Sequence, residues 1–124
     1  MDNRNSLYNL LTAWGKYKNV DNDIKNYNRA DTVNMSENEM NKFRHIAGPA
    51  YLTSQYFSPA LVNFYGAIKE GKDLLQGRGL KDTKYDWKNN QKGINIGDAN
   101  RNIKDNNQKN LFDYIFETEI KPFR

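Results

Sequence analysis

Cysteine is absent from this 124-residue chain, and histidine occurs once, as His45. Without cysteine the chain can form neither disulfides nor thiolate metal sites, and one histidine excludes a multi-histidine zinc site within a single chain. No window approaches the ~18 consecutive apolar residues of a membrane span, and no signal peptide is visible at the N-terminus. We therefore expect no cofactor, no metal and no transmembrane segment, and a cytoplasmic or virion-associated location.

Hydrophobic residues are also scarce, at 37% of the chain, and the mean hydropathy is −0.99. Aromatic residues, at 13%, compensate for this shortage because each one buries a large apolar area. The length suits one domain, and no Pro-, Gly- or Ser-rich linker divides it. The sequence therefore predicts a single domain over residues 1–124 whose core depends on a few large side chains.

The formal net charge is +4, but basic residues are scattered among acidic ones and no run of five like charges occurs. This pattern is typical of an ordinary solvated surface. The positive net charge would allow nucleic acid or lipid headgroups to bind, but no feature of the sequence indicates either partner. Asn is about three times as frequent as in average proteins. Together with many Lys and Tyr residues, this composition indicates an A+T-rich coding sequence of bacterial or phage origin.

Apolar residues recur at helical spacing along most of the chain, whereas the strict alternation typical of a strand is nearly absent. The predicted fold class is all-α, a compact bundle of four to five helices. The predicted helical segments are residues 6–18, 36–55, 58–75, about 84–96 and about 110–120, with a weaker piece over 20–27. A polar loop is expected over about 98–109.

Local signals mark where two of these helices begin and where one ends. Ser36 and Glu39 form the pattern of a capping box, and Ser58 followed by Pro59 is typical of a helix start. Gly77 suits the end of the helix that starts there. In the segment over 58–75, the apolar residues that share one side are Leu61, Phe64, Tyr65, Ile68 and Leu75.

Glycine and proline also interrupt two predicted helices. The Gly48–Pro49 pair lies inside the segment over 36–55, where the missing amide hydrogen of proline predicts a kink near His45. Gly93 lies inside the next-to-last helix, where glycine often marks the close approach of another backbone. Gly97, which follows Ile96, indicates the end of that helix or a turn.

Polar residues gather beside the apolar faces of three successive predicted helices, within the distinctive part of the chain over about 36–97. The residues predicted to form one polar network are Arg44, His45, Glu70, Asp86, Asn89 and Asn90. A carboxylate beside the only histidine would raise the pKa of the imidazole and select its tautomer. A buried network of this kind holds helices in one packing arrangement when its members find partners.

The same residues include candidates for catalysis. His45 with Glu70 or Asp86 could act as a general acid–base pair. A nucleophile is not evident, because Ser54 lies about two turns beyond His45, Ser58 suits a helix cap, and no Gly-x-Ser-x-Gly elbow occurs. The structural network is therefore the favoured interpretation, with the catalytic site as its alternative.

These residues also carry a resemblance. Phe-Arg-His begins at Phe43, Gly-x-x-Lys-Glu-x-x-Asp runs from Gly66 to Asp73, and Asp-x-x-Asn-Asn-x-x-Gly runs from Asp86 to Gly93. The pattern resembles the signature of a loose group of bacterial and phage-associated helical domains of uncharacterised function. It is also distantly similar to the serum amyloid A proteins, which are small four-helix bundles.

The likeness covers residues 42–97 and leaves the terminal segments unmatched. Phe57-Ser58-Pro59 stands where the serum amyloid A proteins have a Gly-Pro-Gly-Gly loop. Lipid transport is therefore not carried over from that family. The resemblance does imply that the His, Glu and Asn positions belong together and that their role is structural.

The leading functional hypothesis is a small non-enzymatic helical structural or binding protein of bacterial or phage origin. It would act through a protein partner, as a component of a virion or of an effector system. One alternative is a small cell-envelope hydrolase, which requires His45 and Glu70 at the floor of an open cleft. Another is a nucleic-acid-binding or inhibitor protein that uses the basic surplus. The sequence does not determine the oligomeric state.

Overall fold

The computed structural model describes residues 7–27, 34–77, 79–101 and 108–124, and every regular element within them is helical. The prediction of an all-α class is thereby confirmed. The α-helices are α1 (Leu7–Leu11), α2 (Ala13–Tyr27), α3 (Glu37–Gln55), α4 (Pro59–Leu75), α5 (Leu80–Asn100) and α6 (Gln108–Ile115). A π-helical turn (Phe116–Ile120) and a 3-10 turn (Lys121–Phe123) follow α6. The side chain of Asp73 and residues 102–107 of the predicted loop lie outside the described residues. The ends of that predicted loop are helical, because residues 98–100 belong to α5 and residues 108–109 belong to α6.

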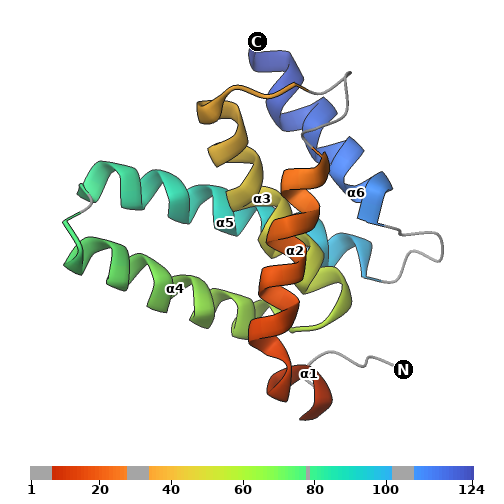
Figure 1. Ribbon diagram of the computed structural model, residues 1–124, viewed down its shortest axis with the longest axis vertical. Helices are drawn as coiled ribbons and strands as arrows, with labels where there is room; N and C mark the ends of the chain where they lie inside the picture. The colour runs from red at the N-terminus through yellow and green to blue at the C-terminus, as the bar shows by residue number, and fades with distance from the viewer. Residues whose placement is uncertain (1–6, 28–33, 78, 102–107) are drawn as a thin grey trace.

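The helices are arranged around α3, which contacts α2, α4, α5 and α6. Figure 1 shows α4 and α5 side by side, as a hairpin that extends beyond the other helices, while α2 crosses in front of α3. The last helix lies along the opposite side, and the C-terminus ends near the start of α3. The guanidinium group of Arg124 holds the C-terminus beside α3, because its Nε donates to Glu39 Oε2 at 2.8 Å.

The predicted local signals at the starts of α3 and α4 are confirmed. Ser36 Oγ accepts from the amide of Glu39 at 3.2 Å, and Glu39 Oε1 accepts from the amide of Ser36 at 3.0 Å, which completes the capping box. Ser58 Oγ accepts from the amide of Leu61 at 3.4 Å at the start of α4. Gly77 follows α4 with φ +93°, a left-handed conformation that glycine adopts without strain.

Several predicted helix bounds were wrong, and contacts distant in sequence explain most of the differences. The first break falls at Thr12, whose hydroxyl donates to the carbonyl of Tyr8 at 2.7 Å, and not near residue 19. The weak polar segment over 20–27 is the continuous second half of α2, because Val20 and Ile24 are buried in the core. The bounds predicted for α3, residues 36–55, agree with the structure, and the helix continues through Pro49. Helix α5 starts before the predicted residue 84 and ends after the predicted residue 96.

Aromatic side chains form the part of the core that joins α2, α3 and α6. The rings of Tyr27 and Phe43 stack with centroids 5.3 Å apart, and Phe112 meets Phe43 edge-on at 5.6 Å. The hydroxyl of Tyr27 donates to Asp113 Oδ1 at 2.7 Å. Burial, and then the hydrogen bond to this carboxylate, raise the pKa of Tyr27. The expectation that a few large aromatic residues support a thin core is met here.

Helices α3 and α5 approach each other backbone to backbone at two glycines. A Cβ atom added to Gly93 would collide with the carbonyl group of Ile46, and one added to Gly97 would collide with the carbonyl group of Ala50. Both contacts repeat after four residues on each helix, so the two helices meet along one continuous stripe. This contact confirms the close approach predicted at Gly93. It also explains why Gly97 lies inside α5 and does not end it.

Replacing Gly93 with Ala should destabilise the fold, although Ala is the better helix former. The added methyl group would push α5 away from the α3 backbone, and overpacking of this kind costs about 1–3 kcal/mol. Gly71→Ala is the matched control, because a Cβ at Gly71 of α4 meets no atom within 4 Å. It should stabilise the protein by about 0.5–1 kcal/mol. Thermal unfolding followed by circular dichroism measures both, and equal shifts for the two variants would contradict the proposed contact.

Candidate functional site

Four of the predicted polar residues converge at the junction of α3, α4 and α5. His45 Nε2 lies 3.4 Å from Asp86 Oδ2, and His45 Nδ1 lies 3.4 Å from Asn90 Oδ1. One imidazole nitrogen of His45 and one carboxylate oxygen each of Glu70 and Asp86 lie within 4.8 Å of one another. The exposed fractions are 8% for His45, 4% for Glu70 and 1% for Asp86. We call these four residues the polar cluster.

The close contact between α3 and α5 brings the polar cluster together. On α5, the spacing from Asp86 to Asn90, Gly93 and Gly97 is that of a single helical face. That face meets α3 at Ile46, the residue directly after His45. Helix α4 joins at Gly66, where an added Cβ would lie 3.4 Å from Asn90 Nδ2. Glu70 follows Gly66 by one helical turn and is therefore on the same face.

The pKa of His45 is lowered, contrary to the expectation that a neighbouring carboxylate would raise it. Burial is the largest cause, since removal from water disfavours the imidazolium, and the positive charge of Lys69 is the second. Asp86 and Asn90 act in the opposite direction, and Arg44 adds a further small lowering. Desolvation therefore outweighs the carboxylate, which sequence spacing alone could not reveal.

The remaining two members of the predicted network form no hydrogen bond or ion pair with the polar cluster within the described residues. The side chain of Arg44 reaches Asp21 of α2, with Nη2 at 2.9 Å and Nε at 3.0 Å from the same carboxylate oxygen. Asn89 is buried, but within the described residues its Nδ2 atom has no hydrogen-bond partner. Arg44 therefore pairs with α2 and not with the polar cluster.

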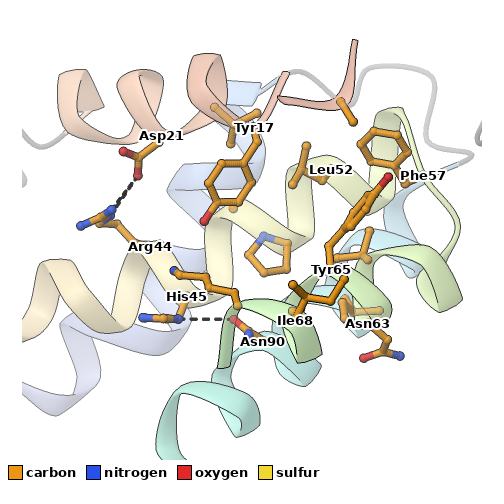
Figure 2. A pocket seen from close by; sticks show the side chains of 18 of the residues that line it. Tyr17, Asp21, Arg44, His45, Leu52, Phe57, Asn63, Tyr65, Ile68 and Asn90 are labelled. Atoms are coloured by element: carbon orange, nitrogen blue, oxygen red, sulfur yellow. Dashed lines mark hydrogen bonds and ion pairs between the residues drawn. The ribbon is translucent and has the colours of Figure 1, made fainter. Parts of the chain in front are cut away.

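A cleft of about 920 Å³ lies beside the polar cluster and is lined by residues of α1, α2, α3, α4 and α5. His45 and Asn90 line it, whereas Glu70 and Asp86 do not. Figure 2 shows His45 and Asn90 at one end of the cleft and Phe57 at the other. The cluster therefore has one side toward the cleft and another toward the interior.

Several of the apolar side chains that line the cleft are exposed. Tyr17 and Leu11 come from the N-terminal helices, and Tyr65 and Ile68 come from α4. Ile68 is 55% exposed, and Leu75, which shares its side of α4, is 91% exposed. The apolar stripe expected on this helix is therefore only partly covered by the rest of the protein. Large exposed apolar patches are typical of interaction sites.

Sequence reasoning did not predict that charged residues line this cleft. Arg44, Lys69 and Lys72 line it, and Asp21 is the carboxylate among its lining residues. Lys69 follows Tyr65 by four residues, and Lys72 follows Ile68 by four residues. This spacing places each lysine beside the apolar stripe of α4, so the sequence could have predicted that proximity. What the sequence could not show is that α2 faces this stripe across a gap.

Hydroxyl groups near the cluster have structural tasks. Ser54 Oγ donates to the carbonyl of Tyr51 at 2.9 Å, and Ser58 Oγ accepts at the start of α4. Neither residue lines the cleft. These two serines therefore do not provide the hydroxyl nucleophile that a catalytic triad with His45 requires.

Comparisons of the chain with protein-family models, curated proteins and solved structures gave no significant match. None of the described helices is both long enough and apolar enough to cross a membrane.

Replacing His45 with Ala should lower the melting temperature by several degrees. The change leaves Asp86 and Asn90 without their imidazole partner, and loss of a buried polar partner costs about 1–3 kcal/mol. Arg44→Ala, at the preceding position, is the control, because surface ion pairs contribute only about 0–1 kcal/mol. Differential scanning calorimetry compares the two, and a His45→Ala melt equal to that of the unmodified protein would contradict a structural role.

Acidification should remove stability through His45. Because its folded-state pKa lies below the ordinary value of 6.5, the unfolded chain binds the proton more tightly. The contribution is therefore present above the unfolded pKa and decreases as the pH falls below it. Melting temperatures of the unmodified protein and of His45→Gln, measured between pH 7.5 and 5.5, should converge toward acid. A difference that grows toward acid would mean that Asp86 outweighs burial and Lys69.

Proposed function

We propose that the chain is a small, non-enzymatic helical binding protein of bacterial or phage origin that acts through a protein partner. The cleft beside α4 is the observation that carries this proposal. The chain has few hydrophobic residues, so leaving any of them outside the core forgoes stability that the fold needs. Nevertheless, Phe64, Ile68 and Leu75 are all exposed on α4. Their exposure is explained if a partner covers them in the functional state.

The chemistry of the cleft favours one kind of occupant, an amphipathic helical segment with acidic residues beside its apolar face. Such a segment places apolar side chains three and four residues apart, which suits a groove lined by Tyr17, Tyr65 and Ile68. Lys69 and Lys72 on the α4 wall would face its carboxylates. Charge complementarity of this kind directs orientation and association rate more than affinity.

The origin and setting of the partner remain part of the proposal. The Asn-rich composition and the resemblance to bacterial and phage-associated domains support a virion component or an effector-associated protein. The resemblance implies a structural role for the matching His, Glu and Asn positions, and the proposal gives the polar cluster that role. On this proposal, the polar cluster holds α3, α4 and α5 in place, and the cleft built on them binds the partner.

A small hydrolase is the second candidate, because His45 borders the cleft and carboxylates lie behind it. The orientation of the imidazole disfavours it. Nδ1 is directed to Asn90 and Nε2 to Asp86, so neither nitrogen is directed to a substrate in the cleft. General-base catalysis requires a nitrogen within hydrogen-bond reach of the substrate or of its attacking water.

Selection from an unbiased library of helical peptides at 150 mM salt tests the proposal. We expect the selected peptides to carry apolar residues at three- and four-residue spacing, flanked by Asp or Glu. Ile68→Glu should weaken their binding at least tenfold, because it places a like charge in the apolar wall. Tyr114→Glu on α6 is the matched control, since Tyr114 is 54% exposed, similar to Ile68, and does not line the cleft.

Three results would contradict the proposal. Selected peptides that bind Ile68→Glu as tightly as the unmodified protein would place the interface elsewhere. Failure to select any peptide, combined with salt-sensitive retention on a polyanion column, would favour the nucleic-acid alternative. Turnover of cell-envelope material that is lost in His45→Gln with an unchanged melting temperature would favour the hydrolase.

A further inference from the structure

The polar cluster contains the donor atoms of a metal site. One imidazole nitrogen of His45 and one carboxylate oxygen each of Glu70 and Asp86 lie within 4.8 Å of one another. All three side chains are buried, and they come from three different helices. Buried carboxylates are rare unless they pair with a cation or coordinate one. The missing cysteines and the single histidine exclude thiolate and multi-histidine sites, but they do not exclude a site of one histidine and two carboxylates.

The hydrogen-bonding capacity of His45 points independently to a cation. Asn90 Oδ1 can only accept, so the hydrogen of a neutral imidazole belongs on Nδ1 if that contact is to be favourable. The lone pair of Nε2 then faces Asp86 Oδ2, which is also an acceptor, at 3.4 Å. Two acceptors in contact repel each other unless a proton or a metal ion lies between them.

The distance between these two acceptors suits a metal ion. A tetrahedral zinc ion, with bonds of about 2.0–2.2 Å to nitrogen and oxygen, separates neighbouring donors by about 3.3–3.5 Å. The 3.4 Å between His45 Nε2 and Asp86 Oδ2 falls in that range. It is longer than the ~2.9 Å typical of a direct N–H···O hydrogen bond. The donor atom of Glu70 lies close enough that rotation of its side chain would bring it into coordination.

We propose that His45, Glu70 and Asp86 bind a divalent transition-metal ion of the zinc type. Imidazole nitrogen suits zinc and its neighbours, and carboxylate oxygen adds the negative charge that neutralises the ion. Asn90 completes the site from outside, because a metal-binding histidine usually donates its other N–H group to an oxygen acceptor. The ion would cross-link α3, α4 and α5, so the site deepens the structural role of the polar cluster and does not depend on the proposed partner.

The charges around the site are compatible with this proposal. Lys69 and Arg44 are the cations that act on His45 electrostatically. Both are exposed, and Arg44 is paired with Asp21. The charge of a divalent cation in the site would therefore be balanced by the two carboxylates, while the positive charges of Lys69 and Arg44 stay outside the site. His45 lines the cleft, which provides a route by which the ion can enter from solvent.

Zinc titration of untagged protein, first dialysed against EDTA and then transferred to chelator-free buffer, tests the site. We expect one equivalent of zinc to raise the melting temperature by several degrees, because a ligand that binds only the folded state stabilises it. Magnesium at the same concentration should have little effect, because it binds proteins mainly through oxygen and keeps its water. Cobalt should develop the intense visible absorption of a four-coordinate site.

The single histidine gives a readout that needs no variant. His45 is the only source of histidine signals in a nitrogen-15 spectrum of the imidazole group. Zinc should shift the Nε2 resonance and leave the Nδ1 hydrogen in place. An imidazolium that carries hydrogens on both nitrogens and does not respond to zinc would overturn the proposal, since a proton would then separate the two acceptors.

Variants assign the donors. Asp86→Asn and Glu70→Gln keep side-chain volume but weaken the oxygen donors, and each should reduce zinc affinity at least tenfold by calorimetry. Asp98→Asn on α5 is the control, because Asp98 pairs with Arg101 near the end of that helix. Affinity unchanged in both site variants would overturn the proposal. If a site variant does not fold, the cobalt and nitrogen-15 measurements on the unmodified protein decide the question.

Discussion

The backbone contact between α3 and α5 at Gly93 and Gly97 sets the geometry of the whole molecule. At these positions a carbonyl group of α3 occupies the space that a side chain would need. Because the contact repeats four residues apart on both helices, it defines their relative rotation as well as their separation. Helix α4 then packs on α5, and α2 and α6 pack on α3. A shift at this contact would therefore move every other helix.

The polar cluster depends directly on that contact. Asp86 and Asn90 lie on the same face of α5 as the two glycines, and His45 precedes the α3 residue that Gly93 touches. Close backbone approach leaves little space between the helices, so the polar groups are buried and the electrostatic interactions among them are less screened than in water. The same burial is costly for charge, which explains why the pKa of His45 is lowered although Asp86 lies beside it. A divalent ion shared by the carboxylates would offset that cost.

The cleft results from the way in which the few hydrophobic residues are distributed around α3. The aromatic residues of α2, α3 and α6 close one side of α3. On the other side, α2 and α4 stay apart, and Tyr17 and Ile68 line the gap between them. A chain with 37% hydrophobic residues has few apolar side chains with which to fill such a gap. The fold is therefore closed by aromatic packing on one side of α3 and has a cleft on the other.

Local chemistry made much of this predictable. The capping box at Ser36, the start at Ser58 and the glycine stop at Gly77 follow from hydrogen bonds and backbone angles within a few residues, so the sequence by itself determined them. It also determined the all-α class, and it predicted His45, Glu70, Asp86 and Asn90 as members of one network because each lies beside an apolar helical face. Only the tertiary structure decided that Arg44 pairs with α2, that Gly97 lies inside α5, and that the stripe on α4 is exposed. The physical reason is that burial, pKa and exposure depend on which distant helix covers a residue, and periodicity along one helix carries no information about its neighbours.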